Sequence, residues 1–133
     1  MTTLFSRDVQ VAVLSSGSKG NCTYIGDGTT GVLIDCGPST KQILSRLDQV
    51  GLGDAPIDAV LVTHEHSDHT SGLPDMRAMS LINQSIIPAF LSSEIKESMT
   101  RNYKYIFDGH KDYSPFMSVK TIESTFTIGN TKI

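Results

Sequence analysis

Three of the four histidines of this chain fall close together in the stretch THEHSDHTSG, residues 63–72. They are His64, His66 and His69, and the acid Asp68 precedes the last of them. Where a strand end stays extended, side chains at positions i and i+2 point the same way, so His64 and His66 can converge on one metal ion. A turn into a helix would then bring Asp68 and His69 to a neighbouring point. The cluster predicts a metal site with ligands suited to Zn²⁺, Mn²⁺ or iron.

Hydrolysis is the chemistry that such a site supports. Asp68 can bind a metal directly and also orient a bound water, so we predict a catalytic role for it. A hydroxide held between two ions is a strong nucleophile near neutral pH. The alternative is a polar loop whose histidines are exposed or otherwise satisfied. Three histidines and an aspartate at this spacing argue against that alternative.

A buried strand must deliver this motif. Residues 57–63, IDAVLVT, form the nearly continuous apolar run expected of a strand covered on both faces. The motif follows at its carboxyl end, where open α/β sheets bind ligands. Further strands are expected at residues 9–14, 22–26 and 32–37, with a hairpin turn at the Asp-Gly pair of residues 27–28.

Two helices flank the predicted strands. The first lies within residues 37–53, capped by Ser39 or Thr40 and ended by Gly51. Its expected apolar face is Ile43, Leu44, Leu47 and Val50. The second spans residues 71–82, with an apolar face of Leu73, Met76, Met79 and Leu81.

The pattern is weaker after residue 85. Residues 85–91 predict an edge strand, because Pro88 has no N–H to donate to a sheet. Residues 92–102 predict a helix, and residues 103–108, 116–122 and 124–133 predict strands and turns. RNYKYIF (101–107) interleaves cations with tyrosines, a composition that can grip single-stranded nucleic acid. An amphipathic strand with solvated cations is the simpler interpretation.

Composition indicates an ordinary soluble globular protein of one domain at most, with 133 residues and 38% hydrophobic residues. A net charge of -3 argues against a broadly basic surface for nucleic acid, but not against a local groove. No apolar run could span a membrane and no signal peptide is evident, so we expect a cytoplasmic protein. If the hairpin centres on Thr29, Cys22 and Cys36 face each other, and we expect two buried thiols.

THEHSDH resembles the H-x-H-x-D-H signature of the metallo-β-lactamase superfamily of metal-dependent hydrolases. LIDCG (33–37), IDAVLVT (57–63) and SGL (71–73) resemble the segments that surround this signature in the family. VLSSGSKGNCTYI (13–25) is similar to the S-G-S-x-G-N loop of the WalJ/YycJ-like subgroup, which is associated with exonuclease activity on DNA.

The resemblance implies an α/β (α+β) fold, the αββα sandwich of two facing sheets with helices outside. Residues 1–133 would be an incomplete domain, the N-terminal half, with a mixed sheet and flanking helices. The inner sheet face would then lack its partner, which favours self-association. The family completes its site with two more histidines and a bridging acid. The remaining histidine here, His110, lacks the expected surroundings, and we do not expect it to be a ligand.

The resemblance also assigns roles to site residues. It implies that His64 and His66 bind the first of two divalent ions, and that Asp68 and His69 bind the second. Zn²⁺ is the expected metal, with Mn²⁺ or iron as alternatives. Asp35 would lie beneath the site and hold the motif loop by hydrogen bonds, and Asn21 would lie on a loop near its rim.

We therefore expect a metal-dependent hydrolase that acts on nucleic acid, a phosphodiesterase or nuclease of the DNA exonuclease type. We expect this chain by itself to be inactive. One alternative is a hydrolase of thioesters or other small molecules on the same scaffold. Another, from a different class, is a non-catalytic half-domain that binds metal.

Overall fold

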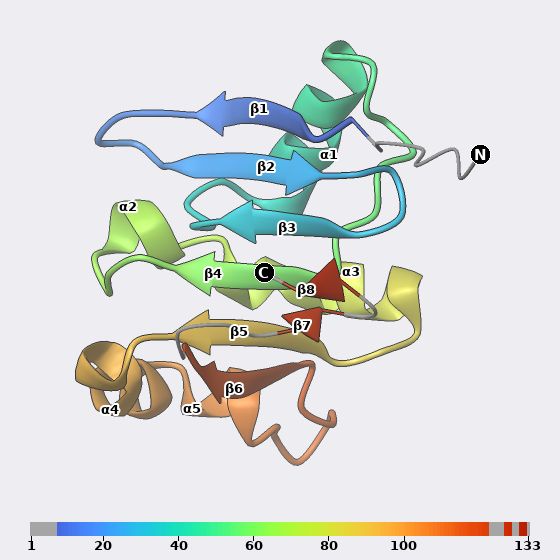
Figure 1. Ribbon diagram of the computed structural model, residues 1–133. Coiled ribbons are helices and arrows are strands. Elements are labelled where there is room, and N and C mark those ends of the chain that lie inside the picture. The colour runs from blue at the N-terminus through green and yellow to red at the C-terminus, as the bar shows by residue number, and fades with distance from the viewer. Residues whose placement is uncertain (1–7, 123–126, 129–130, 133) are drawn as a thin grey trace.

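The computed structural model describes residues 8–122, 127–128 and 131–132, and its centre is a six-stranded sheet (Figure 1). The strands run in the order β1 (Gln10–Ser15), β2 (Cys22–Gly26), β3 (Gly31–Ile34), β4 (Ala59–Val62), β5 (Ile87–Leu91) and β6 (Met117–Thr121). The first three pair antiparallel, and β3 to β6 pair parallel. The predicted mixed sheet is confirmed. That the chain is one incomplete domain stays a prediction.

Helices cover one face of this sheet (Figure 1). They are α1 (Thr40–Gln49), a 3₁₀ turn η1 (Leu73–Asp75), α3 (Met76–Asn83), α4 (Ser93–Asn102) and α5 (Lys104–Phe107). The short helix α2 (Ser67–Thr70) lies past the end of β4 (Figure 1). The predicted cap of α1 is Ser39, whose hydroxyl accepts from the Gln42 N–H while the Gln42 side chain accepts from the Ser39 N–H. Among the described residues, none of the helices has the length and apolar character needed to cross a bilayer.

The main core lies between the sheet and α1, α3, α4 and α5. Alternate strand residues such as Leu33, Val60 and Ala89 meet helix residues that include Ile43 and Met76. Four methionines are buried in this core, Met76, Met79, Met99 and Met117.

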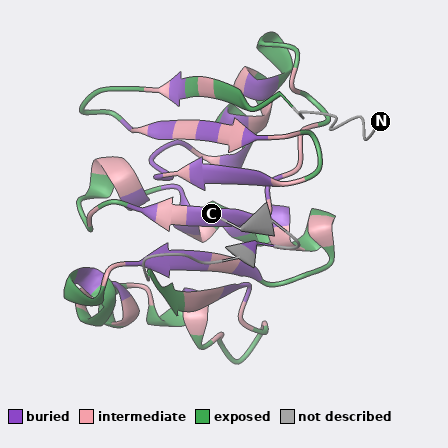
Figure 2. Cartoon of the chain, in the orientation of Figure 1, coloured by how far each residue is buried: buried purple, intermediate pink, exposed green. Residues whose placement is uncertain are grey.

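The described residues cover the opposite sheet face only in part (Figure 2). Ile128 of β7 (Thr127–Ile128), which pairs with β8 (Thr131–Lys132), packs there against Val32, Ala59 and Phe90. The predicted turn at residues 129–130 lies outside the described residues. On β1, Val11 and Val13 are 63% and 69% exposed, while Leu14 is buried in the main core. Self-association through this face stays a prediction.

Two predicted strand features are wrong. The segment 85–91 is not an edge strand, because β6 pairs along the far side of β5 from Ile87 to Leu91. The sheet accommodates Pro88, which removes a single donor. Residues 103–108 do not form a strand, since α5 occupies most of that segment. Helical winding there buries Ile106 fully, so tertiary packing overrides the strand preference of the aromatic residues.

The apolar faces of α1 and α3 and the register of the hairpin also differ from those predicted. Val50 is 58% exposed because α1 ends at Gln49. Leu81 is 68% exposed because it lies on the other side of α3 from buried Met76, about 140° away at about 100° per residue. The hairpin pairs Thr23 with Ile34, one position off the predicted register, so Cys22 and Cys36 are not opposite each other. Both thiols are free and buried, as expected, and burial raises the pKa of Cys22 to about 12.

Candidate metal site

The histidine motif begins where β4 ends, at the carboxyl edge of the parallel part of the sheet (Figure 1). β4 stops at Val62, and the chain stays non-helical until His66, whose extended backbone precedes α2. Asp68 and His69 then lie within the short helix α2. The strand-to-helix turn predicted from the sequence is confirmed.

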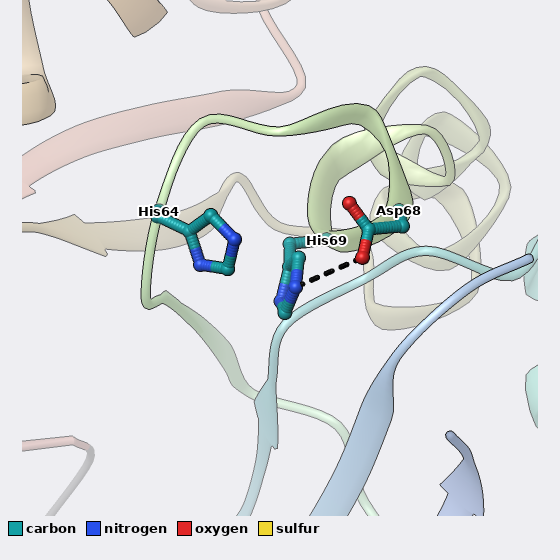
Figure 3. Close-up of side chains that lie close together, drawn as sticks. All are labelled: His64, Asp68 and His69. Atoms are coloured by element: carbon teal, nitrogen blue, oxygen red, sulfur yellow. Dashed lines mark ion pairs between the residues drawn. The ribbon is translucent and has the colours of Figure 1, made fainter. Parts of the chain in front are cut away.

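Three of the four predicted ligands come together. One ligand atom from each of His64, Asp68 and His69 lies within 4.8 Å of the others (Figure 3). The rings of His64 and His69 have centroids 3.7 Å apart, and His69 Nε2 lies 3.1 Å from Asp68 Oδ2. All three side chains are partly buried. Two imidazoles and a carboxylate around one point are a donor set that a divalent transition metal accepts.

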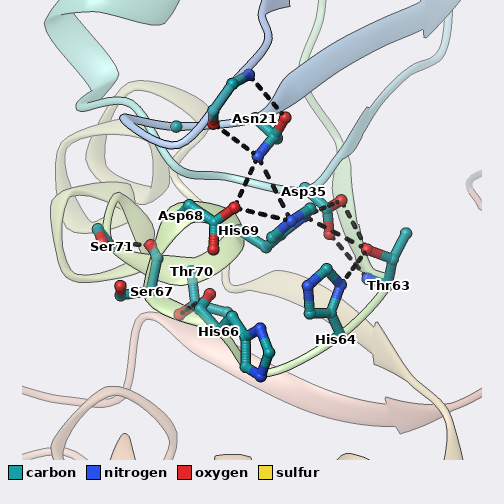
Figure 4. A network of polar contacts seen from close by, with 12 residues as sticks. Asn21, Asp35, Thr63, His64, His66, Ser67, Asp68, His69, Thr70 and Ser71 are labelled. Atoms are coloured by element: carbon teal, nitrogen blue, oxygen red, sulfur yellow. Dashed lines mark hydrogen bonds and ion pairs between the residues drawn. The ribbon is translucent and has the colours of Figure 1, made fainter.

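His66 is placed differently. It is exposed and lies outside this three-residue group. Its ring centroid is nevertheless 4.8 Å from that of His64, and its ring points away from Asp68 (Figure 4). The structure therefore puts His66 beside its predicted partner His64, but apart from Asp68 and His69.

Asp35 lies beneath the motif and is 5% exposed. Its backbone is left-handed, with φ 63°, a conformation that aspartate tolerates better than most residues. One carboxylate oxygen accepts from the Thr63 N–H at 2.7 Å. The other accepts from the Thr63 hydroxyl at 2.7 Å and lies 2.7 Å from His69 Nδ1. Asp35 thus joins the end of β3 to both ends of the motif loop.

These contacts fix which nitrogen of each histidine faces the cluster. A carboxylate only accepts, so His69 Nδ1 must donate to Asp35, and a neutral His69 keeps its lone pair on Nε2. The Thr63 hydroxyl already donates to Asp35, so His64 Nδ1, 3.1 Å away, is the donor in that contact. Both histidines are thereby left with Nε2 as the free acceptor.

Asn21 holds the motif from the other side (Figure 4). Its side-chain amide donates to Asp68 Oδ2 at 3.0 Å and lies 3.4 Å from His69 Nε2. A pair of contacts at 3.1 Å with the Gly17 backbone fixes the same amide. The Asn21 N–H also donates to the Asp68 carbonyl at 2.7 Å. The glycine-rich loop is therefore bonded directly to the motif.

The cluster fits a cation. With Nδ1 of His69 committed to Asp35, two acceptor atoms, His69 Nε2 and Asp68 Oδ2, lie 3.1 Å apart. Such acceptors repel unless a proton or a metal ion lies between or beside them, and the Asn21 amide satisfies them only in part. Among the described residues, His69 Nε2 and Asp68 Oδ2 are therefore not fully hydrogen-bonded, so both atoms can bind a positive ion.

Close backbone packing holds the motif helix against the chain after β3. A Cβ at Gly72 would collide with the Pro38 carbonyl, and a Cβ at Gly37 would collide with the Asp68 carbonyl. The Cys36 N–H donates to the His69 carbonyl at 2.8 Å. These glycines correspond to the LIDCG and SGL segments noted in the sequence.

Sequence reasoning missed two contributors. Thr63 contacts Asp35 through both its backbone and its hydroxyl, and its place directly before His64 was the available signal. Buried Thr70 shares a hydrogen bond of 2.8 Å with the Tyr103 hydroxyl, a contact across 33 positions that no local pattern reveals.

His110 lies far from the candidate site. It lies in the segment between α5 and β6, where it forms an isolated bridge with Tyr113. Its ring is 52% exposed, and Nδ1 lies 3.4 Å from Asp112 Oδ2. Among the described residues His110 joins no group of metal-ligating side chains. That it is not a ligand stays a prediction.

Comparisons with known proteins agree with this geometry. Residues 16–129 match the Metallo-beta-lactamase superfamily. The chain is 35% identical over 101 residues to Exodeoxyribonuclease WalJ of Streptococcus pneumoniae serotype 2, strain D39, a match covering 73% of this chain and 38% of that protein. It is 44% identical over 62 residues to Exodeoxyribonuclease YycJ of Bacillus anthracis, covering 47% of this chain and 24% of that protein.

The fold is likewise similar to solved structures. BJP-1, a subclass B3 metallo-β-lactamase of Bradyrhizobium japonicum, superposes with a TM-score of 0.63 at 19% identity. That match covers 96% of this chain and 48% of BJP-1. At this identity the likeness concerns the fold alone. The chain spans about half of that structure and 38% of the length of the WalJ relative.

Proposed function

Because the chain belongs to the metallo-β-lactamase superfamily, we propose that it carries the metal-binding motif of a phosphodiesterase that cleaves nucleic acid, in the manner of a DNA exonuclease. Membership of the superfamily supports a metal-dependent hydrolase. The similarity to two proteins called exodeoxyribonucleases supports the narrower choice of nucleic acid as substrate. Cytoplasmic residence remains part of the proposal, and the free, buried cysteines fit a reducing compartment.

The proposed ligands of the first ion to bind are His64, Asp68 and His69. Their ligand atoms within 4.8 Å of one another are the single observation that carries the proposal. When two ions bind, His64 would move to an ion shared with His66, whose ring is beside it, and Asp68 and His69 would keep the other ion. Zn²⁺ is the proposed metal, since imidazole and carboxylate are among its usual ligands. Divalent ions there would activate water and stabilise charge on phosphate oxygens.

The remaining side chains position these ligands. Asp35 keeps the His69 proton on Nδ1, so Nε2 faces the site. Asn21 donates to Asp68 and so fixes one oxygen of that carboxylate. Thr63 separates Asp35 from His64 and hydrogen bonds to both. Together they hold the ligands in one geometry before any ion binds, which reduces the cost of ordering the site.

Replacing Asp68 tests the proposed activity. In the protein as its gene encodes it, Asp68→Ala should abolish release of nucleotides from labelled DNA in the presence of Zn²⁺ or Mn²⁺. Asp54→Ala is the matched control, because Asp54 is exposed in the loop that follows α1. Cleavage that survives Asp68→Ala, or is lost equally in the control, would refute the assignment.

Metal binding without hydrolysis is the second candidate. It is favoured by one observation: the described ligand atoms gather around one point rather than two. A protein of this kind would bind a single ion per chain and would release no nucleotides under the same conditions. A metal titration combined with the nuclease assay separates the two candidates.

A further inference from the structure

A groove lies along α4 and α5, helices at the same end of the sheet as the metal motif (Figure 1). Its volume is about 580 Å³. Three cationic side chains line it, Lys96, Arg101 and Lys104, together with the acids Glu97 and Asp108. The lining thus has a net charge of +1, three positive against two negative, on a chain whose net charge is -3.

The three cations are exposed and have few partners. Among the described residues, none of the three cations forms an ion pair. This holds although Glu97 lies four residues before Arg101, and Asp108 lies four residues after Lys104. Lys96 Nζ has a single hydrogen bond, to the Thr121 hydroxyl at 3.4 Å. Their charges are therefore available to an anionic ligand.

A buried contact ties this groove to the metal motif. Tyr103, at the junction of α4 and α5, shares a hydrogen bond of 2.8 Å with Thr70, the residue after His69. Tyr105 follows two positions later, with its side chain 40% exposed and its ring centroid 6.4 Å from that of Tyr103. An exposed aromatic ring is thus next to Lys104 in the chain, on a helix whose N-terminal cap residue, Tyr103, contacts the residue after His69.

We propose that α4 and α5 bind single-stranded nucleic acid, with Lys96, Arg101 and Lys104 contacting backbone phosphates and Tyr105 stacking on a base. Cations that follow a backbone, combined with an aromatic platform, are what sequence-tolerant recognition of single strands requires. An acidic peptide would satisfy the cations but would not use the aromatic ring. The inference rests on the proposed function, because it names how the substrate of that site is held.

Oligonucleotide binding by the 133-residue chain tests the surface. The probe is a short fluorescent single-stranded DNA, followed by anisotropy over a range of salt concentrations with EDTA present. The variant Lys96→Gln/Lys104→Gln should lower the salt dependence by about 1.4 in the slope of log affinity against log salt, since each phosphate contact contributes about 0.7. Lys41→Gln/Lys111→Gln, an equal charge change at exposed positions elsewhere, should leave the slope unchanged.

The tyrosine gives a second, charge-neutral test. Tyr105→Leu should lower oligonucleotide affinity about fivefold or more through lost stacking, whereas Tyr105→Phe should keep it. The proposal is overturned if the chain binds no oligonucleotide, if the groove and control variants behave alike, or if polyglutamate competes as well as DNA of equal charge. EDTA keeps metal out of the assay, so a failed nuclease assay and a failed binding assay are separate results.

Discussion

His69 Nδ1 lies 2.7 Å from Oδ2 of Asp35, although 34 positions separate the two residues in the chain. The contact joins the end of β3 to the motif that follows β4, and it leaves His69 Nε2 as the acceptor that faces Asp68. An acidic partner of this kind orients a metal-binding histidine and makes it a better ligand. The neighbouring strands β3 and β4 thus position His69, one of the proposed ligands.

Asp35→Asn should weaken Zn²⁺ binding about 10- to 100-fold. Asparagine tolerates the left-handed backbone of this position, so the local conformation is kept. The substitution replaces one of the two accepting carboxylate oxygens by an NH₂ group, which cannot accept. Competition with a chromophoric chelator would measure the affinity. Asp58→Asn is the control, because the Asp58 carboxylate accepts from the Gly31 N–H at 2.9 Å, at the other end of β3. Equal affinities in wild type and Asp35→Asn would limit Asp35 to a structural role.

Asn21→Ala should also reduce Zn²⁺ affinity, by about tenfold. The substitution frees Asp68 Oδ2 from a donor at 3.0 Å and releases the glycine-rich loop, so the ligands must be ordered by the ion itself. The same chelator competition applies. Asn83→Ala is the matched control, since the Asn83 amide donates to the Ile57 carbonyl at 2.7 Å, away from the site. Similar losses in both variants would argue against a specific role for Asn21.

Tyr103→Phe should destabilise the fold by about 1 kcal/mol, because it removes the hydrogen bond to buried Thr70. Tyr105→Phe should change stability by less than about 0.5 kcal/mol, since the described residues give its hydroxyl no hydrogen-bond partner and the side chain is partly exposed. Urea unfolding measures both. A larger loss in Tyr105→Phe than in Tyr103→Phe would contradict the assignment of that contact.

Alkaline pH should destabilise the chain partly through Cys22. Burial raises the pKa of this thiol from 9.0 to about 12, so the folded state disfavours the thiolate that the unfolded state readily forms. Its contribution to stability is complete below pH 9 and is lost as the pH rises from about 9 to 12. The free energy of unfolding of Cys22→Ala should therefore decline less steeply over this range. Parallel declines would exclude the thiol as a cause.

Much of the fold could be predicted from local sequence patterns. The motif strand, the Ser39 cap and Gly51 were predictable because each depends on near neighbours in sequence. The helical state of residues 104–107 and the interior place of β5 were not, because they depend on the burial of Ile106 and on pairing with β6. The register of the hairpin formed by β2 and β3 differs by one position from the predicted register, because the prediction depended on which residue was taken as the centre of the turn.

The candidate site, too, could be predicted from the sequence only in part. Spacing predicted that His64 and His66 converge, with Asp68 and His69 at a neighbouring point, whereas the structure groups His64 with Asp68 and His69. The resemblance pointed to Asp35 and Asn21. The place of Thr63 directly before His64 was an available signal for its contacts. The Thr70–Tyr103 hydrogen bond joins segments whose proximity is set by the tertiary fold, so no sequence pattern revealed it.

Binding of a divalent ion by His64, Asp68 and His69 is the central requirement of the proposed function. Isothermal titration with Zn²⁺ of the wild-type chain, of Asp68→Ala/His69→Ala and of Asp112→Ala/His110→Ala tests this directly. The last variant removes a histidine and an aspartate that lie 3.4 Å apart away from the site. We predict binding by the wild type and by this control, and loss of binding in Asp68→Ala/His69→Ala. Equal titration of all three proteins would contradict the proposed metal site.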